Sequence, residues 1–245
     1  MLILEFDLGN TSAKWRLLEA GDVVERGRIT ELDSFVPPSA GKIGAVRVAS
    51  VAGEAREQAL SQWCQNTVGL GPRIARTTAH CSGVSCAYAE PHRLGVDRWL
   101  AVLAAYHHCP QGALILDAGT ALTIDLVNRR GQHLGGYILP GQQLMQTSLR
   151  QDTARIVYAE TAEPALNPGC STAEAVVNGA ALSAAAVAQA ALQQARTLLG
   201  ESCGAFITGG DAELILRLLG EKAGDFAYYP DLVMEGLARA CPIIE

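Results

Sequence analysis

Two short segments of the chain could each bind a phosphate group, and the first lies close to the start of the sequence. There an apolar run ends in Asp7, Gly9 allows a tight turn, and amide, hydroxyl and ammonium groups follow. These donors can face phosphate oxygens. Asp7 would repel a phosphate but is suited to hold Mg²⁺, usually through water molecules. The segment expected to bind the phosphates together with Mg²⁺ consists of Asp7, Leu8, Gly9, Asn10, Thr11, Ser12, Ala13 and Lys14.

The second segment lies near the middle of the chain and has a similar order of residue types, Asp117-Ala118-Gly119-Thr120-Ala121. Thr120 would donate its hydroxyl to a phosphate, whereas Asp117 could bind a cation or cap the turn. A single Asp-x-Gly turn is more often a plain hairpin turn. Because the two copies occupy equivalent places in the two halves of the chain, we expect a phosphate-binding role for both.

A third glycine-rich stretch, 207–212, is expected where a strand meets the start of a helix. Its glycines would let a purine and its ribose approach the backbone. A tight turn without any ligand explains the same residues equally well, so both interpretations stay open at this point.

A substrate-binding segment is expected between Tyr88 and Arg98. Asp97 and Arg98 follow Gly95 at the start of a predicted helix. An aspartate beside an acceptor hydroxyl can take its proton, and Arg98 could keep Asp97 ionised and bind an acidic substrate. The alternative is structural: Asp97 carries the negative charge that favours a helix N-terminus, and Arg98 is solvated.

The elements that would position these residues follow one plan twice. In each half, three antiparallel strands joined by tight turns are followed by alternating helices and strands. This plan predicts an α/β fold of two duplicated domains with mixed sheets, 1–112 and 113–245. The expected strands are 2–7, 13–18, 23–29, 43–51, 73–77, 113–117, 122–127, 133–139, 205–208 and 226–229. The expected helices are 54–68, 96–107, 142–149, 172–199, 212–219 and 232–240, and Ser171 with Glu174 predicts a capping box at 172.

The composition indicates a globular protein that binds neither nucleic acid nor membrane. Of the 245 residues, 49% are hydrophobic and 18% are charged, and the net charge of -6 disfavours general attraction to phosphate backbones or anionic lipids. The most apolar stretch, 179–192, is shorter than a membrane-spanning helix requires. The first residues lack the basic flank of a signal peptide, so we expect a cytoplasmic protein.

The seven cysteines and five histidines are not expected to form a disulfide framework or a metal site. The cysteines are odd in number, dispersed and never spaced as Cys-x-x-Cys, which favours reduced thiols. The histidines form no cluster with the spacing of metal ligands.

Six strings occur in matching order over nearly the whole chain and together resemble the type III pantothenate kinases. They are Asp7-x-Gly9-Asn10-Thr11-x-x-Lys14-Trp15, Tyr88-x-x-Pro91-x-x-Leu94-Gly95-x-Asp97-Arg98, Asp117-x-Gly119-Thr120-Ala121, Gly135-Gly136-Tyr137-Ile138-x-Pro140-Gly141, Ser171-Thr172-Ala173-Glu174 and Thr208-Gly209-Gly210-Asp211. The resemblance implies two duplicated ribonuclease-H-like (actin-like ATPase) domains with mixed five-stranded sheets.

The resemblance also implies an ATP-dependent kinase that transfers the γ-phosphoryl group to the 4′-hydroxyl of pantothenate. The product is 4′-phosphopantothenate, in the first step of coenzyme A biosynthesis. Mg²⁺, a monovalent cation (K⁺ or NH₄⁺) and a homodimer are further implications. Carried over by position, Asp97 accepts the proton, Asp7 to Lys14 bind the ATP phosphates with Mg²⁺, Asp117 binds the monovalent cation and Thr120 contacts ATP. The residues implied to hold pantothenate are Tyr88, Gly95, Val96, Asp97, Arg98 and Thr172.

The chain departs from the family pattern just before the substrate segment. Many members have Asn-x-Tyr where this chain has Cys86-Ala87-Tyr88. The tyrosine is kept, but the group that supports its loop is different.

Two other functions are compatible with parts of the sequence. A sugar or carboxylate kinase of the same fold would share the paired Asp-Gly turns but would not need the 95–98 segment. A non-catalytic accessory factor for transcription, as some relatives are described, is disfavoured by the intact Asp7, Asp97 and Asp117.

Overall fold

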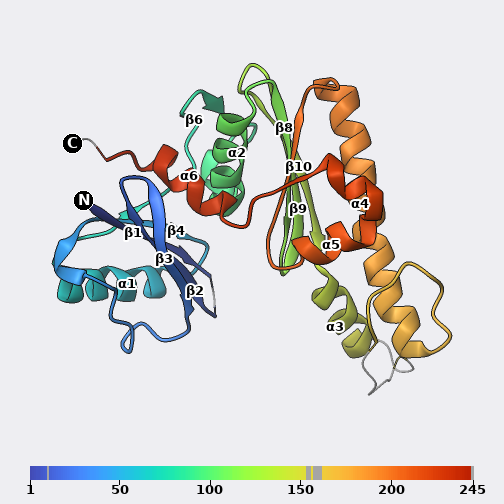
Figure 1. The fold of residues 1–245 in the computed structure, drawn as a ribbon, viewed down its shortest axis with the longest axis horizontal. Helices are drawn as coiled ribbons and strands as arrows, with labels where there is room; N and C mark the ends of the chain where they lie inside the picture. Colours follow the sequence, from blue (N-terminus) through green and yellow to red (C-terminus); the bar gives the residue numbers. More distant parts are fainter. Residues whose placement is uncertain (10, 153–155, 157–161, 244–245) are drawn as a thin grey trace. The chain divides into compact units, whose positions relative to one another are not determined.

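The computed structural model describes residues 1–9, 11–152, 156 and 162–243, which form two compact units (Figure 1). Unit 1 consists of Met1–Ala104 together with the C-terminal segment that starts at Asp231, and unit 2 is Ala105–Pro230. Each unit is an α/β structure built on its own five-stranded sheet.

The sheet of unit 1 has the strand order β3-β2-β1-β4-β5. The first three strands pair antiparallel, and β4 and β5 then add in parallel beyond β1. The five strands are β1 (Leu2–Leu8), β2 (Ala13–Glu19), β3 (Asp22–Ile29), β4 (Ile43–Ser50) and β5 (Arg73–Ile74). The helices are α1 (Glu54–Thr67), α2 (Val96–His108), whose last turn belongs to unit 2, and α6 (Leu232–Ala240). Short elements are the 3₁₀ helices η1 (Ala40–Lys42) and η2 (Pro91–Arg93) and the hairpin of β6 (His80–Cys81) with β7 (Val84–Ser85).

The sheet of unit 2 repeats this plan with the order β10-β9-β8-β11-β12. Its strands are β8 (Gly112–Ala118), β9 (Ala121–Asn128), β10 (His133–Pro140), β11 (Gly204–Thr208) and β12 (Ala227–Tyr228). Its helices are α3 (Gln142–Asp152), α4 (Thr172–Leu199), α5 (Ala212–Leu219) and the 3₁₀ helix η3 (Gly220–Asp225). Three antiparallel strands followed by two parallel ones, in the same order in both units, confirm the predicted duplication and the mixed five-stranded sheets.

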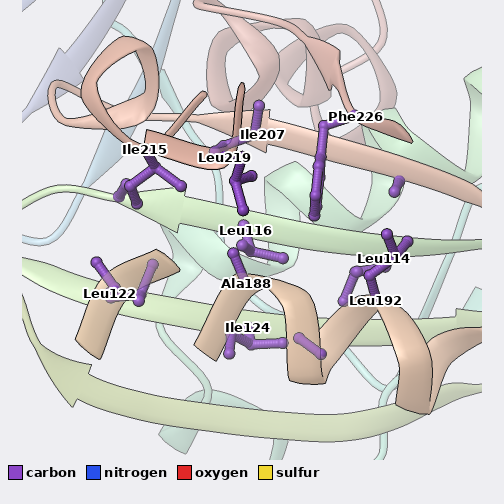
Figure 2. Close-up of a cluster of buried hydrophobic side chains, with 14 of the residues drawn as sticks. Leu114, Leu116, Leu122, Ile124, Ala188, Leu192, Ile207, Ile215, Leu219 and Phe226 are labelled. Carbon is purple, nitrogen blue, oxygen red and sulfur yellow. The ribbon is translucent and has the colours of Figure 1, made fainter. Parts of the chain in front are cut away.

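Alternating residues of the central strands form the core of unit 2. Leu114 and Leu116 of β8 and Ile124 of β9 are almost fully buried on one face of the sheet. Figure 2 shows these side chains gathered around Ala188 and Leu192 of α4. Burying each large aliphatic side chain contributes about 1.5–3 kcal/mol, so this face fixes the strands that carry the second Asp-Gly turn.

Helix α4 is long and apolar enough to span a membrane by length and composition alone. Its alanines at 180, 181, 184, 185, 188, 191 and 195 are buried in unit 2. Small side chains on one face let a helix lie close to a sheet, and this packing accounts for the apolar composition of α4.

Unit 1 buries aliphatic and aromatic side chains on one face of its sheet and charged side chains on the other face. Leu4 and Phe6 of β1 pack in one cluster with Leu60 and Trp63 of α1. The ring centroids of Phe6 and Trp63 are 5.7 Å apart in an edge-to-face arrangement. The aromatic packing therefore anchors α1 against β1, the strand that carries Asp7.

A buried ion cluster ties the C-terminal segment to the other face of this sheet. Glu5 is fully buried, and its carboxylate accepts hydrogen bonds from Arg16 Nε at 2.7 Å and Arg47 Nη1 at 3.0 Å. Arg16 Nη1 also lies 3.6 Å from Asp231 Oδ2, just before α6. Removing one partner of a buried ion pair typically costs about 3–5 kcal/mol, so Glu5 holds Arg16 firmly in place beside the start of α6.

The compact units divide at different places from the predicted domains 1–112 and 113–245. Unit 2 starts at Ala105, within α2, and the chain returns to unit 1 at Asp231. The return has a packing reason: a Cβ on Gly236 of α6 would lie 2.2 Å from the carbonyl oxygen of Leu100 in α2. Only glycine permits this close crossing, which holds α6 on unit 1.

Candidate active site

The first Asp-Gly turn lies at the end of β1, between the two neighbouring strands. Asp7 is paired with Lys14 of β2 on one side and with Ala49 of β4 on the other. The turn is closed by the N–H of Gly9, which donates to the carbonyl of Ser12 at 3.0 Å. Asn10, which the sequence predicts as a phosphate ligand, lies outside the described residues. The turn thus has the tight form expected for a phosphate-binding segment.

The carboxylate of Asp7 is held in surroundings that disfavour its charge. Burial is the largest cause that raises the pKa of Asp7, and the negative charge of Asp97 raises it further. Lys14 and Arg28 act in the opposite direction but do not cancel the effect. Lys14 and Arg28 are themselves cross-strand partners in β2 and β3. Asp7 would therefore be stabilised by an additional cation.

This arrangement fits Mg²⁺ better than a metal held only by the protein. Mg²⁺ usually keeps several waters and takes one or two carboxylates together with phosphate oxygens. Asp7 could supply a carboxylate, and the predicted phosphate ligands follow it in the same segment. Within the described part of the chain, no three His, Cys, Asp or Glu side chains gather as a metal cage.

Asp97 lies in the first turn of α2, in the same unit as Asp7. Its Oδ1 accepts a hydrogen bond from the backbone N–H of Arg98 at 2.8 Å. A Cβ on Gly95 would lie 2.6 Å from that same oxygen, so glycine leaves the carboxylate its place. Asp97 thus has a fixed carboxylate and lies close enough to raise the pKa of Asp7.

Arg98 and Tyr88 form one polar contact behind this helix start. The Arg98 side chain is buried, and its Nη1 donates to the Tyr88 hydroxyl at 3.2 Å. The backbone N–H of Tyr88 in turn donates to the sulfur of Cys86 at 3.4 Å. An Asn side chain commonly accepts from the N–H two residues further on, and here a thiol makes the same local bond. The departure at Cys86 therefore keeps an acceptor for the loop.

Val96 is a further predicted substrate residue, at the first position of α2. Its side chain is buried in unit 1. A contact of Val96 with a ligand would have to use its backbone.

The second Asp-Gly turn lies at the corresponding place in unit 2. Asp117 is paired with Thr123 of β9 and with Thr208 of β11. The N–H of Gly119 donates to Ala121 O at 3.0 Å, and Thr120 is exposed at the tip. Thr120 is therefore accessible to a ligand.

The third glycine-rich stretch packs directly against this second turn. Gly209 has a φ of +95°, and a Cβ there would lie 2.6 Å from Asp117 Oδ1. The N–H of Asp211 donates to the carbonyl of Ala118 at 2.8 Å, and burial raises the pKa of Asp211. Asp211 was not predicted as a site residue. The signal that could have found it is the parallel pairing of β8 and β11, which brings their carboxyl ends to one sheet edge.

Thr172 is the first residue of α4, and the predicted capping box is confirmed in part. Ser171 Oγ accepts from the N–H of Glu174 at 3.2 Å. Glu174 reaches back one residue further than expected, because its carboxylate accepts from the N–H of Cys170 at 2.6 Å. Thr172 is exposed beside this capped end. Unit 1 thus brings Asp7, Lys14 and Asp97 together, whereas Asp117, Thr120 and Thr172 belong to unit 2.

Sequence comparisons identify relatives over the whole chain. A family model described as type III pantothenate kinase matches residues 3–194. Proteins named type III pantothenate kinase from Pseudomonas putida (strain W619) and Pseudomonas aeruginosa (strain LESB58) are each 40% identical to this chain. Each alignment covers 99% of this chain and 100% of the relative.

Solved structures of similar fold are more distant in sequence. A Baf family transcriptional activator from Campylobacter jejuni has a TM-score of 0.58 at 19% identity and covers 95% of this chain and 94% of its own. The Listeria monocytogenes protein Lmo2764, described as an N-acetylmannosamine kinase, has a TM-score of 0.51 at 13% identity with 97% of both chains covered. At these identities the likeness is one of fold alone, and it agrees with the predicted actin-like class.

The environment of Asp7 predicts a stability effect that depends on pH. Because burial raises the pKa of Asp7 above the ordinary value of 3.8, the folded state holds this proton more tightly than the unfolded chain. The ionised carboxylate therefore lowers the free energy of unfolding once the pH exceeds both pKa values. Asp7→Asn should raise that free energy at neutral pH, and the gain should vanish as the pH falls below 3.8. Urea unfolding of both proteins, from neutral pH to below 3.8, measures this difference in the free energy of unfolding.

Asp33→Asn, at an exposed position of the same unit, controls for the loss of one negative charge. An Asp7→Asn protein that is less stable than wild type at neutral pH would contradict the argument.

Proposed function

The chain belongs to the type III pantothenate kinase family, and we propose that its two Asp-Gly turns and its 88–98 segment carry the reaction of that family. The protein is an ATP-dependent pantothenate kinase. It transfers the γ-phosphoryl group of ATP to the 4′-hydroxyl of pantothenate and gives 4′-phosphopantothenate, the first step of coenzyme A biosynthesis. The observation that carries this conclusion is 40% identity over the full length of relatives with that name.

Asp97 is the proposed proton acceptor. One of its oxygens is fixed by the Arg98 N–H, which sets the direction of the carboxylate at the helix start. The other oxygen, Oδ2, is assigned to take the proton of the attacking 4′-hydroxyl. General-base catalysis needs a group held in a fixed position. A short bond from the neighbouring backbone supplies the position.

The segment from Asp7 to Lys14 is the proposed site for the ATP phosphates. Backbone and hydroxyl donors of the turn face the phosphate oxygens, and the Lys14 ammonium neutralises part of their charge. Asp7 would hold Mg²⁺ through water, and Mg²⁺ supplies charge neutralisation on the transferred group. Asn10 belongs to this proposal on sequence grounds only.

Arg98 and Tyr88 are proposed to hold the carboxylate end of pantothenate. The planar guanidinium group of Arg98 suits a carboxylate, and its contact with the Tyr88 hydroxyl limits its orientations. The other proposed substrate contacts are Gly95, Thr172 and the backbone of Val96. The Cys86–Tyr88 bond supports the loop that carries the tyrosine.

In unit 2, Thr120 is the proposed ATP contact and Asp117 the proposed ligand of K⁺ or NH₄⁺. The Asp117 carboxylate lies at the strand end, beside the carbonyl groups of the turn and the open backbone of Gly209. Oxygen atoms of this kind replace the hydration shell of a monovalent ion.

The reaction and its ion dependence are tested by one assay. ADP formation in the presence of Mg²⁺ and K⁺ should require pantothenate, and it should be measured in a coupled assay with hexoses and acetate as alternative acceptors. Turnover of a hexose and none of pantothenate would contradict the function and favour the sugar kinase. Replacement of K⁺ or NH₄⁺ by Na⁺ should remove most activity, whereas equal rates in Na⁺ would refute only the role of Asp117.

Asp97→Asn should lower turnover by about 10²–10⁴-fold, the usual range for a lost general base. The amide can still accept the Arg98 N–H, so folding and ATP affinity should change little. Steady-state kinetics and calorimetric ATP binding measure the two effects. The matched control is Glu90→Gln, which removes one negative charge at an exposed position of the same 88–98 segment. Near-normal turnover of Asp97→Asn would exclude Asp97 as the base.

A homodimer is proposed through the exposed apolar surface of unit 2. Leu134, Tyr137 and Ile138 of the edge strand β10 are 45%, 48% and 65% exposed, and Leu182 and Leu198 of α4 are 53% and 57% exposed. Exposed apolar side chains along an edge strand are suited to pack against the same side chains of a second copy of the protein. We also propose that the dimer works in the cytoplasm, where ATP and reduced thiols are found.

Ile138→Asp should convert the dimer to monomers, because a carboxylate would be buried without a partner in the interface. Sedimentation velocity measures the change. Val36→Asp, at a similarly exposed position of unit 1, should leave the dimer intact. An Ile138→Asp protein with unchanged mass would place the interface elsewhere.

A further inference from the structure

The side chain of Gln142 is an unusual feature of unit 2 that the proposed mechanism does not use. Gln142 is the first residue of α3 and is only 6% exposed. Neither its amide oxygen nor its amide nitrogen is exposed or has a hydrogen-bond partner among the described residues. The neighbouring Gln143 is exposed. Two glutamines in succession are thus in opposite environments.

An unpaired buried amide is energetically unfavourable. Each buried donor or acceptor without a partner costs about 1–3 kcal/mol, and an apolar side chain of similar size would avoid this cost. Buried polar groups are nearly always paired in folded proteins, so each exception needs an explanation. Pairing with a ligand would offset the cost at the moment of binding.

The position of Gln142 indicates which ligand this is. The preceding residue, Gly141, donates its N–H to Thr120 O at 2.9 Å. A Cβ on Gly141 would lie 2.1 Å from the carbonyl oxygen of Gly119. The start of α3 is therefore pressed against the second Asp-Gly turn. Thr120 is exposed at the tip of that turn and is the proposed ATP contact.

The start of α3 is also suited to an anion. The first N–H groups of a helix have no acceptor within the helix, and the helix dipole places positive potential there. A phosphate beside Thr120 would meet this end of α3. The amide of Gln142 offers two further N–H donors at the same place.

We propose that Gln142 binds the phosphate chain of the nucleotide through its side-chain amide nitrogen, next to Thr120. This inference rests on the proposed nucleotide site of the second turn. The amide is enclosed in the free protein and rotates toward the phosphates when the nucleotide binds. Gln142 then selects nucleotides that carry a phosphate chain. It lies outside the six strings that resemble the family.

Gln142→Leu separates a role in nucleotide binding from a purely structural role. We expect the stability of the free protein to rise and the affinity for the nucleotide to fall. Removing the unpaired amide should raise the melting temperature of the free protein by about 2–4 °C. The affinity for Mg-ATP and Mg-ADP, measured by calorimetry, should fall about tenfold to one-hundredfold, as for a lost hydrogen bond to a charged group. The affinity for adenosine should stay unchanged. Gln143→Leu is the control and should change neither affinity.

Gln142→Met provides a second apolar variant if Gln142→Leu folds poorly. Wild-type affinity for Mg-ADP in a folded Leu or Met variant would overturn the proposal, and so would an equal loss for adenosine. Because this experiment measures nucleotide binding directly, its outcome is independent of the test for pantothenate kinase activity. A wild-type enzyme that turns over pantothenate while Gln142→Leu binds Mg-ADP normally would refute only the role of Gln142. Absence of pantothenate turnover by wild type would instead contradict the proposed function.

Discussion

The proposed chemistry depends on the burial of the Asp7 carboxylate, close to the like charge of Asp97. Both carboxylates belong to unit 1, and burial together with the charge of Asp97 raises the pKa of Asp7. Lys14 and Arg28 offset only part of this effect. A cation bound near Asp7 would offset the remainder. The buried site therefore favours binding of a cation.

The two Asp-Gly turns have diverged because their neighbours differ. In unit 1 the charged side chains of β2 and β3 flank Asp7. In unit 2 backbone atoms crowd the turn, since Gly209 and Gly141 press against it from two sides. A side chain at either glycine would collide with a carbonyl or carboxylate oxygen. One turn is thus built around charge and the other around close backbone approach, although their strand order is the same.

The sequence predicted the sheets well because strand alternation and turn residues are local signals. It did not predict the β6–β7 hairpin, whose strands have two residues each, and β5 is shorter than expected. The contact of Gly209 with Asp117 joins segments far apart in the chain, so no local pattern reveals it. The bond from Tyr88 to the Cys86 sulfur was also missed, because cysteine is not a usual turn acceptor. Phosphate binding and the proton acceptor were predicted from residue types and spacing, whereas pantothenate, the monovalent cation and the dimer came only from family resemblance.

The return of α6 to unit 1 has a consequence for the order of folding during synthesis. Unit 2 ends at Pro230, so all of its residues precede α6 on the ribosome. Unit 1 includes Met1–Ala104 but lacks Asp231 and α6 until the segment after Pro230 emerges. Domains usually complete folding in the order of their synthesis. Here unit 1 is completed after unit 2, and its buried Arg16 receives its contact with Asp231 only once all of unit 2 has been synthesised.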